Sequence, residues 1–243
     1  MITAVFSDVH GNLEALEAVL RDARDQGAGR FVCLGDVVGY GADPDACCER
    51  VRGLKGVVVR GNHDHACSHR SPLVWFNPLA AAAARWTRAA LSEGNRAWLR
   101  DLPYEAREEG AQFVHGGLDD PRHWPYLFPE EDASAHFRRQ RERFCFVGHT
   151  HVPVLFAQVE GRVRAARLSS FRLGPDEPVK VTVNVGSVGQ PRNGDPRACY
   201  CLWDTERGVI APRRIAYDVD TAERKIRAAG LPELLAERLS LGR

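Results

Sequence analysis

Five short groups of histidine, aspartate and asparagine occur in the first 151 residues of the sequence. They are Asp8-Val9-His10, Gly35-Asp36, Gly61-Asn62-His63-Asp64, His115-Gly116 and Gly148-His149-Thr150-His151. Imidazole and carboxylate ligands suit Mn, Fe, Zn, Co or Ni. A structural zinc site would favour closely spaced thiolates, and the nearby Cys33 and Cys145 lie inside strand-like segments. The residue types therefore indicate a metal site other than structural zinc.

Each group comes directly after a strand-like run of apolar residues. These runs are residues 2–7, 31–34, 57–60, 112–114 and 145–147. Ligands of open α/β sheets bind beyond the carboxyl ends of the strands, so five strand ends offer side chains to what could be one place. Asp8 and His10 are at positions i and i+2, which share one side of an extended segment, and His149 and His151 repeat that spacing.

The elements that position these groups are predicted to form an α/β fold. In the first half, helical spacing over residues 12–24 separates strand-like runs, which predicts βαβ units. Asn77-Pro78 predicts a helix start, followed by helices over 79–91 and 95–102. The second half reads mostly as alternating strands, with closing helices at 220–229 and 232–239. We expect two mixed sheets packed together with helices outside, and a single domain over residues 1–243.

Composition excludes several classes of function. The 33 basic and 32 acidic residues give a net charge of +1, which argues against a broad nucleic-acid surface or a polybasic membrane surface. No apolar run approaches the length of a membrane span, and the first residues do not read as a signal peptide. The seven cysteines are scattered, so we expect reduced thiols and a cytoplasmic location.

Taken in this order, the five groups resemble the calcineurin-like metallophosphoesterase superfamily. Its pattern is D-x-H, G-D, G-N-H-D, a histidine followed by glycine, and G-H-x-H, and each element is present here behind a strand-like run. Residues 184–192 are similar to a segment of the small bacterial phosphodiesterase group. Residues 119–127 resemble a piece found in members that act on dinucleoside polyphosphates.

The resemblance implies a four-layer α/β/β/α sandwich with two divalent transition-metal ions (Mn, Fe, Zn, Ni or Co). In it Asp8, His10 and His151 hold the first ion, and Asp36 bridges both ions. Asn62, His115 and His149 hold the second ion.

The chemistry expected of such a centre is hydrolysis of a phosphate ester. Two cations about 3.5–4 Å apart can share one water and lower its pKa, which gives a metal-bridging hydroxide nucleophile. Small phosphorylated molecules are the expected substrates, with phosphodiester, phosphomonoester or pyrophosphate bonds, and nucleotides and dinucleoside polyphosphates among them. His63 follows the ligand Asn62, so it could face the leaving group and donate a proton or a hydrogen bond.

One position departs from the family pattern. Many protein-phosphatase members carry a second aspartate three residues after the bridging one, where it orients the G-N-H-D histidine, but Gly39 stands there in this chain. Asp64 or Asp43 could substitute, or His63 could work without a carboxylate partner. The departure counts against a phosphoprotein phosphatase. A non-catalytic protein-binding scaffold of the same fold is the other alternative, although all seven candidate ligands and His63 are present.

Further residues are candidates for contact with the substrate. Asn12 and Tyr40 follow ligand groups, and Arg192 could lie near the phosphate, although loop arginines are usually solvated. Four aromatic residues could form a wall against the base of a nucleotide substrate, or could simply pack within the protein: Trp75, Phe76, Trp124 and Tyr126. We expect His69, His123 and His136 to lie at the surface. Residues 119–131 are expected to form a long loop, and the sequence leaves open whether it is a lid.

Overall fold

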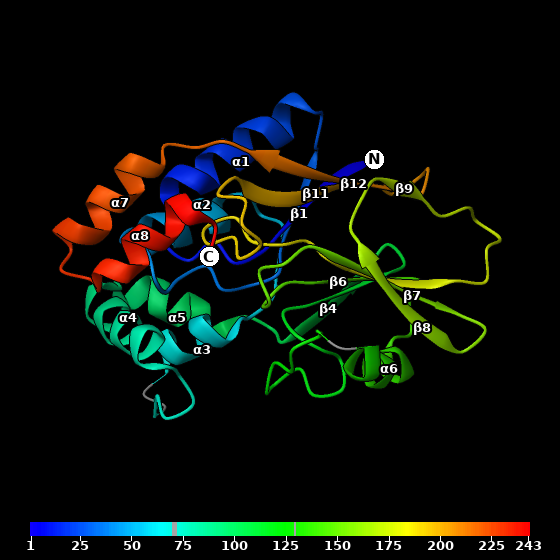
Figure 1. Ribbon diagram of the computed structural model, residues 1–243, viewed down its shortest axis with the longest axis horizontal. Helices are drawn as coiled ribbons and strands as arrows, with labels where there is room; N and C mark the ends of the chain where they lie inside the picture. Colours follow the sequence, from blue (N-terminus) through cyan, green and yellow to red (C-terminus); the bar gives the residue numbers. More distant parts are fainter. Residues whose placement is uncertain (70–71, 129) are drawn as a thin grey trace.

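A computed structural model describes residues 1–69, 72–128 and 130–243 (Figure 1). The strands are β1 Ile2–Phe6, β2 Arg30–Cys33, β3 Val57–Val58, β4 Glu105–Glu108, β5 Ala111–Val114, β6 Phe144–Val147, β7 Val154–Val159, β8 Arg162–Arg167, β9 Phe171–Arg172, β10 Lys180–Asn184, β11 Ala198–Asp204 and β12 Val209–Ile215. The helices are α1 Leu13–Asp25, α2 Pro44–Gly53, α3 Asn62–Ser68, α4 Pro78–Ala90, α5 Glu93–Asp101, α6 Glu130–Arg139, α7 Val219–Ala228 and α8 Glu233–Leu241.

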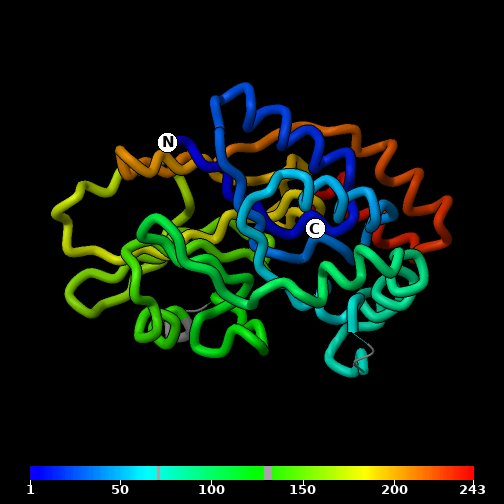
Figure 2. The backbone as a smooth tube through the Cα atoms, turned by 180° about the vertical axis from the view of Figure 1, so that it is seen from behind, coloured from blue at the N-terminus to red at the C-terminus, as the bar shows by residue number. Residues whose placement is uncertain are grey.

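The strands form two mixed sheets, as the sequence predicts. The first has the order β3-β2-β1-β11-β12-β9 and the second the order β4-β5-β6-β10-β7-β8. In the first sheet β1 is parallel to β2 but antiparallel to β11. Figure 2 shows this pairing from behind, where the N-terminal strand lies beside strands from the end of the chain. In the second sheet β5, β6 and β10 are parallel neighbours, so their carboxyl ends meet at one edge.

The alternation of side chains along the strands builds the layers. Phe6 packs with residues of α1 and α2 on one face of the first sheet, whereas its neighbour Val5 packs with Phe113 and Phe146 of the second sheet. On the outer face of the second sheet, Val147 packs with Phe137 of α6. Because successive side chains of a strand point to opposite faces, both sheets are covered on both sides. The expected four-layer α/β/β/α sandwich is thereby confirmed (Figure 1).

Several helix starts follow from their capping residues. Asn12 accepts a hydrogen bond from the backbone N–H of Ala15 and begins α1. Asn77 caps α4 in the same way ahead of Pro78, as the Asn-Pro pair predicts. None of the helices in the described part of the chain is long and apolar enough to cross a bilayer.

Three elements differ from the sequence expectation. The helix α6 begins at Glu130, within the segment 119–131 that we expected to be a loop. The helix α3 begins at Asn62, and β4 lies between α5 and β5. Each is short, and α3 and β4 are rich in polar residues, so local apolar periodicity gives little signal for them.

Candidate metal centre

Five of the seven residues predicted to bind metal have unusual backbone conformations. Positive φ values occur at Asp8 (55°), His10 (51°), Asp36 (52°), His149 (68°) and His151 (62°). Such values are uncommon outside glycine and cost free energy, so they persist where the surrounding structure imposes them, often at functional sites. Here they turn the chain sharply beyond the strands, so that side chains from different strand ends converge.

Backbone hydrogen bonds join these turns to one another. Asp8 N–H donates to the carbonyl of Gly35 (3.0 Å), and His10 N–H donates to the carbonyl of Asp36 (2.9 Å), which links the ends of β1 and β2. His149 N–H donates to Oδ2 of Asp8 at 3.1 Å. This last bond connects the second sheet to the first, so the ligands from both sheets are held in one rigid region.

Among the residues that the structure describes, three groups of candidate ligands have their donor atoms within 4.8 Å of one another. They are Asp8, His10 and His151; His10, Asp36 and His63; and Asp36, His115 and His149.

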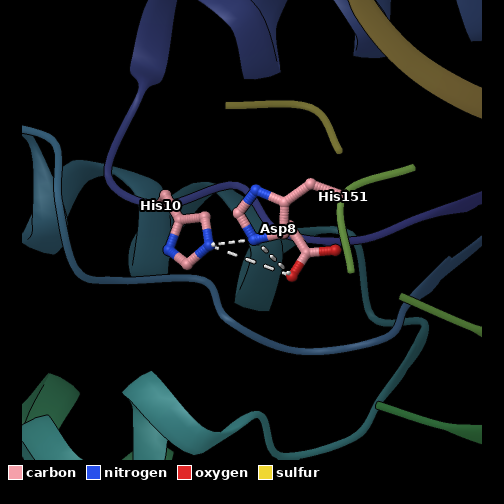
Figure 3. A group of neighbouring side chains, drawn as sticks. All are labelled: Asp8, His10 and His151. Atoms are coloured by element: carbon pink, nitrogen blue, oxygen red, sulfur yellow. Dashed lines mark hydrogen bonds and ion pairs between the residues drawn. The ribbon is translucent and has the colours of Figure 1, made fainter. Parts of the chain in front are cut away.

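Figure 3 shows the first group, in which Nε2 of His10 lies 3.1 Å from Nε2 of His151 and Oδ1 of Asp8 lies 3.5 Å from Nε2 of His151. Oδ2 of Asp36 is 3.7 Å from Nε2 of His10 and 3.3 Å from Nε2 of His115. Asp36 therefore lies between two groups, where a bridging ligand would have to be.

The histidine rings present their lone pairs to the centre. Nδ1 of His10 lies 3.1 Å from the carbonyl of Val38, and Nδ1 of His151 lies 2.6 Å from the carbonyl of Gln190. His115 makes the same contact with a carbonyl at 2.8 Å. A carbonyl can only accept, so Nδ1 donates, and each ring carries its lone pair on Nε2 when it is neutral. Fixing the tautomer through the outer nitrogen is the usual way in which proteins orient metal-binding imidazoles.

The electrostatics and the unpartnered atoms fit bound cations. Oδ1 of Asp8, Oδ1 of Asn62 and Nε2 of His115 are buried and lack a hydrogen-bond partner in the described structure. Burial, followed by the negative charge of Asp36, raises the pKa of Asp8 to about 7. Burial also lowers the pKa of His10 well below its ordinary value, which favours the neutral ligand form. Two buried carboxylates and the imidazoles around them make a donor set that metal ions would satisfy.

His115 responds to the same two carboxylates. Burial would lower its pKa, but the negative charge of Asp36, followed by that of Asp8, outweighs burial and raises the pKa to about 9. Burial opposes ionisation of Asp36 too, yet the charges of His115 and His63 hold the pKa of Asp36 well below its ordinary value. The centre thus attracts positive charge strongly.

Asp64 does not orient His63, contrary to one alternative from the sequence. Its carboxylate accepts hydrogen bonds from the N–H groups of Asp36 (2.7 Å), Val37 (2.8 Å) and Gly61 (3.0 Å). Asp64 therefore clamps the turn of the bridging aspartate to the start of α3. Asp43, the other alternative, lies 2.8 Å from Nζ of Lys225.

His63 is held by packing rather than by a carboxylate. Its ring lies 4.5 Å from the ring of Tyr40 and 4.8 Å from that of Phe76, and it is 4% exposed. Its Nδ1 has no hydrogen-bond partner among the described residues, and a Cβ on Gly39 would lie 2.4 Å from that atom. Any side chain at position 39 would thus collide with the imidazole, so this site has no space for the second aspartate of the protein phosphatases.

The three predicted substrate contacts lie in different surroundings. Tyr40 is buried with its ring 4.7 Å from that of His10. Nη2 of Arg192 is 3.5 Å from the hydroxyl of Tyr40, so both residues border the centre. The amide of Asn12 caps α1 and donates to the carbonyl of Gly189 at 3.0 Å, so its polar atoms already have partners within the protein.

Two features of this region were not anticipated. His136 is buried, not at the surface as expected, and its Nδ1 accepts from the N–H of Leu118 at 3.0 Å while its Nε2 lies 2.9 Å from Oγ1 of Thr182. It thereby ties α6 to the loop that follows His115. That loop carries Tyr126, whose ring stacks on His149 at 3.9 Å. A histidine on a short polar helix gives no signal of burial in the sequence.

Together the α/β/β/α layers and the clustered carboxylate and imidazole donors define a metal-dependent phosphoesterase. Residues 1–208 match the calcineurin-like phosphoesterase superfamily domain. The chain belongs to this superfamily, which confirms the resemblance noted in its motifs.

Individual relatives agree with this assignment. The chain is 40% identical to the protein MJ0912 of Methanocaldococcus jannaschii over 99% of this chain and 98% of the relative. It is 29% identical to phosphodiesterase YfcE of Escherichia coli K12 over 84% of this chain and 89% of the relative. The solved structure of a metallophosphoesterase from Sphaerobacter thermophilus matches with a TM-score of 0.88 and 37% identity, covering 100% of this chain and 99% of that one.

Proposed function

We propose that the protein hydrolyses phosphate esters or anhydrides of small molecules at a centre that holds two divalent transition-metal ions. The observation that carries this proposal is the convergence of buried, inward-facing ligand atoms around Asp36, which belongs to two of the ligand groups. The first ion is assigned to Asp8, His10 and His151. The second is assigned to Asn62, His115 and His149, with Asp36 shared.

In the proposed reaction the metal ions and the residues of the chain have different roles. Bound cations would lower the pKa of a water molecule and neutralise charge on the phosphoryl oxygens. The protein fixes the ligands in space through the turns beyond the strands and through the carbonyls that orient the imidazoles. Hydrolysis adds the oxygen of water to phosphorus, and the P–O bond to the leaving group breaks with its electron pair.

His63 is proposed to act at the leaving group. One of its ring nitrogens lies within 4.8 Å of the ligand atoms of His10 and Asp36. Its backbone N–H donates to Oδ1 of Asp36 at 2.8 Å, which fixes the start of α3 beside the bridging aspartate. The aromatic rings of Tyr40 and Phe76 set the orientation of the imidazole. In this position the ring can donate a hydrogen bond or a proton to the departing oxygen.

Small phosphodiesters, phosphomonoesters and pyrophosphates, nucleotides and dinucleoside polyphosphates among them, are the proposed substrates. The likeness to a protein named phosphodiesterase supports this class. Gly39 disfavours a phosphoprotein phosphatase, because a Cβ added there would lie 2.4 Å from Nδ1 of His63 and the aspartate typical of those enzymes would not fit. A net charge of +1 is compatible with a phosphate substrate, since bound cations supply positive charge locally.

The cytoplasm is the proposed compartment, with residues 1–243 working as one domain. All seven cysteines are free and buried, which suits a reducing environment. Both sheets contribute ligands, and side chains of both sheets share one core cluster, which supports a single unit.

The direct test is a substrate panel on protein loaded with Mn²⁺, Ni²⁺ or Co²⁺. Bis-p-nitrophenyl phosphate, p-nitrophenyl phosphate and diadenosine tetraphosphate represent the three bond types. We expect turnover of at least one of them, abolished by a chelator and restored by the metal. An absence of turnover on all three with every metal would refute the proposal.

Two variants separate metal binding from chemistry. Asn62→Ala removes a candidate ligand and should lower the bound metal measured by elemental analysis. His63→Ala should keep the metal but lose rate by ~100-fold or more. His123→Ala, an exposed histidine whose side chain is 82% accessible, is the matched control and should match the unmodified protein. Full activity of His63→Ala would contradict the role given to His63.

A further inference from the structure

Two exposed aromatic residues beside the metal centre have no part in the proposed reaction. Tyr126 and Phe128 belong to the loop between β5 and α6, and they are 47% and 58% exposed. We infer that this aromatic pair binds the base of a nucleotide by stacking, so that the preferred substrates are phosphate esters or anhydrides of nucleosides rather than of aliphatic alcohols. The inference rests on the proposed function, because it places the phosphate of the substrate at the metals.

The aromatic pair continues a row of rings that starts at a candidate metal ligand. The ring of Tyr126 stacks on that of His149, with the ring centres 3.9 Å apart and the planes 14° from parallel. The ring of Phe128 lies 5.4 Å from that of Tyr126, with 15° between the planes. His149 is only 7% exposed, so the row leads from the buried centre to the surface, and each ring is nearly parallel to the next.

The loop that carries the aromatic pair is anchored to the rest of the protein. Leu127, between Tyr126 and Phe128, is buried in the apolar cluster that the second sheet forms with α6. This is the pattern of an extended segment with one side in the core and the other at the surface. The N–H of Gly117 donates to the carbonyl of Pro125 at 2.8 Å, and Figure 1 shows the loop between α3 and α6. The two rings are therefore held in place beside the centre.

Ordinary packing explains other aromatic residues near the centre, but not this pair. The ring of Trp124 lies 5.4 Å from that of His65, and its indole N–H donates to a backbone carbonyl at 3.1 Å. The ring of Phe76 lies 4.8 Å from that of His63. These rings are used within the protein. The aromatic pair instead leaves about half of its surface in water, where a second flat apolar group could cover it and gain the free energy of burial and stacking.

A nucleobase suits this position by its shape and by its distance from the phosphate. Every base has a flat π face, and stacking on aromatic side chains is tolerant of the base sequence. In a nucleotide one sugar separates the base from the phosphate, so a phosphate at the metals leaves the base near the edge of the centre, where the row of rings begins. An ester of an aliphatic alcohol has no flat group to place there. The aromatic pair would therefore distinguish between these two classes of substrate.

A binding experiment tests the inference without turnover. The phosphonate analogues of AMP and of ribose 5-phosphate, in which CH₂ replaces the ester oxygen and prevents hydrolysis, are titrated into metal-loaded protein by calorimetry. We expect the analogue with adenine to bind ~10-fold more tightly, equivalent to ~1.4 kcal/mol. Phe128→Leu keeps an apolar side chain but lacks the flat ring, so it should lose most of this preference, whereas Phe128→Tyr should retain it. Val159→Ala, at a 45% exposed apolar residue of β7, is the matched control and should also retain it.

The outcomes separate this inference from the proposed function. Equal affinity for the two analogues, or an unchanged preference in Phe128→Leu, would overturn the inference. If the substrate panel still shows metal-dependent turnover, the proposed function stands. Phe128→Leu should bind as much metal as the unmodified protein by elemental analysis, because Phe128 contacts Tyr126 and not a candidate ligand. A loss of metal along with the preference would assign the effect to the ligands and overturn the stacking role. Failure of both analogues to bind metal-loaded protein would contradict the proposed function as well.

Discussion

Replacing Gly39 with alanine is the sharpest test of how His63 is positioned. The new Cβ would lie 2.4 Å from Nδ1, 3.0 Å from Cγ and 3.2 Å from Cβ of His63. The φ angle of Gly39 is +95°, a conformation that alanine adopts only with strain. The substitution therefore combines a local collision with a backbone penalty, and the two effects have different consequences.

Both magnitudes can be worked from this geometry. Ordinary contact begins at 3.4 Å, so the imidazole has to retreat by about 1 Å, and a misplacement of that size can cost ~100-fold in rate. That factor corresponds to ~2.7 kcal/mol of transition-state stabilisation. The backbone strain lowers the free energy of unfolding by ~1–2 kcal/mol. We therefore expect a folded protein with a severe loss of activity.

The assay is the hydrolysis of bis-p-nitrophenyl phosphate by metal-loaded protein, together with thermal unfolding and metal analysis. Gly110→Ala is the matched control, because Gly110 also has a positive φ (+75°) but no atom within 4 Å of the added Cβ. It should lose a similar amount of stability and keep its activity. The double variant Gly39→Ala with His63→Ala should be no slower than His63→Ala alone, since both changes act through one imidazole.

Retention of activity by Gly39→Ala within a few fold would refute this reasoning, because it would show that the reaction does not need His63 where the structure places it. A loss of bound metal in Gly39→Ala would also contradict it, since the effect would then run through the ligands. Equal losses of activity in Gly39→Ala and Gly110→Ala would assign the effect to backbone strain alone.

Three further predictions concern stability. Saturating Mn²⁺ should raise the free energy of unfolding, by ~2.7 kcal/mol at 100 times Kd, and a chelator should reverse the shift in Tm; an unchanged Tm would argue against a built metal site. Asp22→Asn should destabilise the protein at neutral pH, because a hydrogen bond from Arg213 lowers the pKa of Asp22. The stabilisation by the ionised Asp22 is complete above the ordinary pKa of aspartate and is lost as the pH falls through the lowered pKa of Asp22. Denaturant unfolding should therefore show that the difference in stability between Asp22→Asn and the unmodified protein shrinks below roughly pH 4. A difference in stability that stays constant with pH would contradict this prediction. His136→Leu should cost ~1–3 kcal/mol by leaving the N–H of Leu118 unpaired, and a variant as stable as the parent would exclude this role for His136.

Local patterns in the sequence predict much of the fold. The strand-like runs at 2–7, 112–114 and 145–147 correspond to β1, β5 and β6, because each is a short apolar run between polar or glycine residues. The Asn-Pro pair marks the start of α4, since capping depends on neighbouring residues alone. By contrast, α3, β4 and α6 are short and have little periodicity, so only packing against the rest of the fold stabilises them.

The sequence also indicates the chemistry of the candidate site, because the types and order of the motif residues specify which side chains are available as metal ligands. The sequence does not give the distances between these side chains. His10 and His151 are separated by 141 residues, yet their Nε2 atoms lie 3.1 Å apart. Motif order and strand ends predict that such residues share a region, but the pairing of β1 with β11 and the hydrogen bond from His149 to Asp8 decide how closely they approach.

The sequence by itself therefore determined the family, the ligand types and the layered α/β architecture, since these depend on residue identity and short-range periodicity. Only the tertiary structure decided that Asp64 clamps a turn, that aromatic rings orient His63 and that His136 is buried. The physical reason is that hydrogen bonds, burial and charge interactions depend on separations of a few ångströms. Those separations are set by the packing of segments remote in the chain, which no local pattern records.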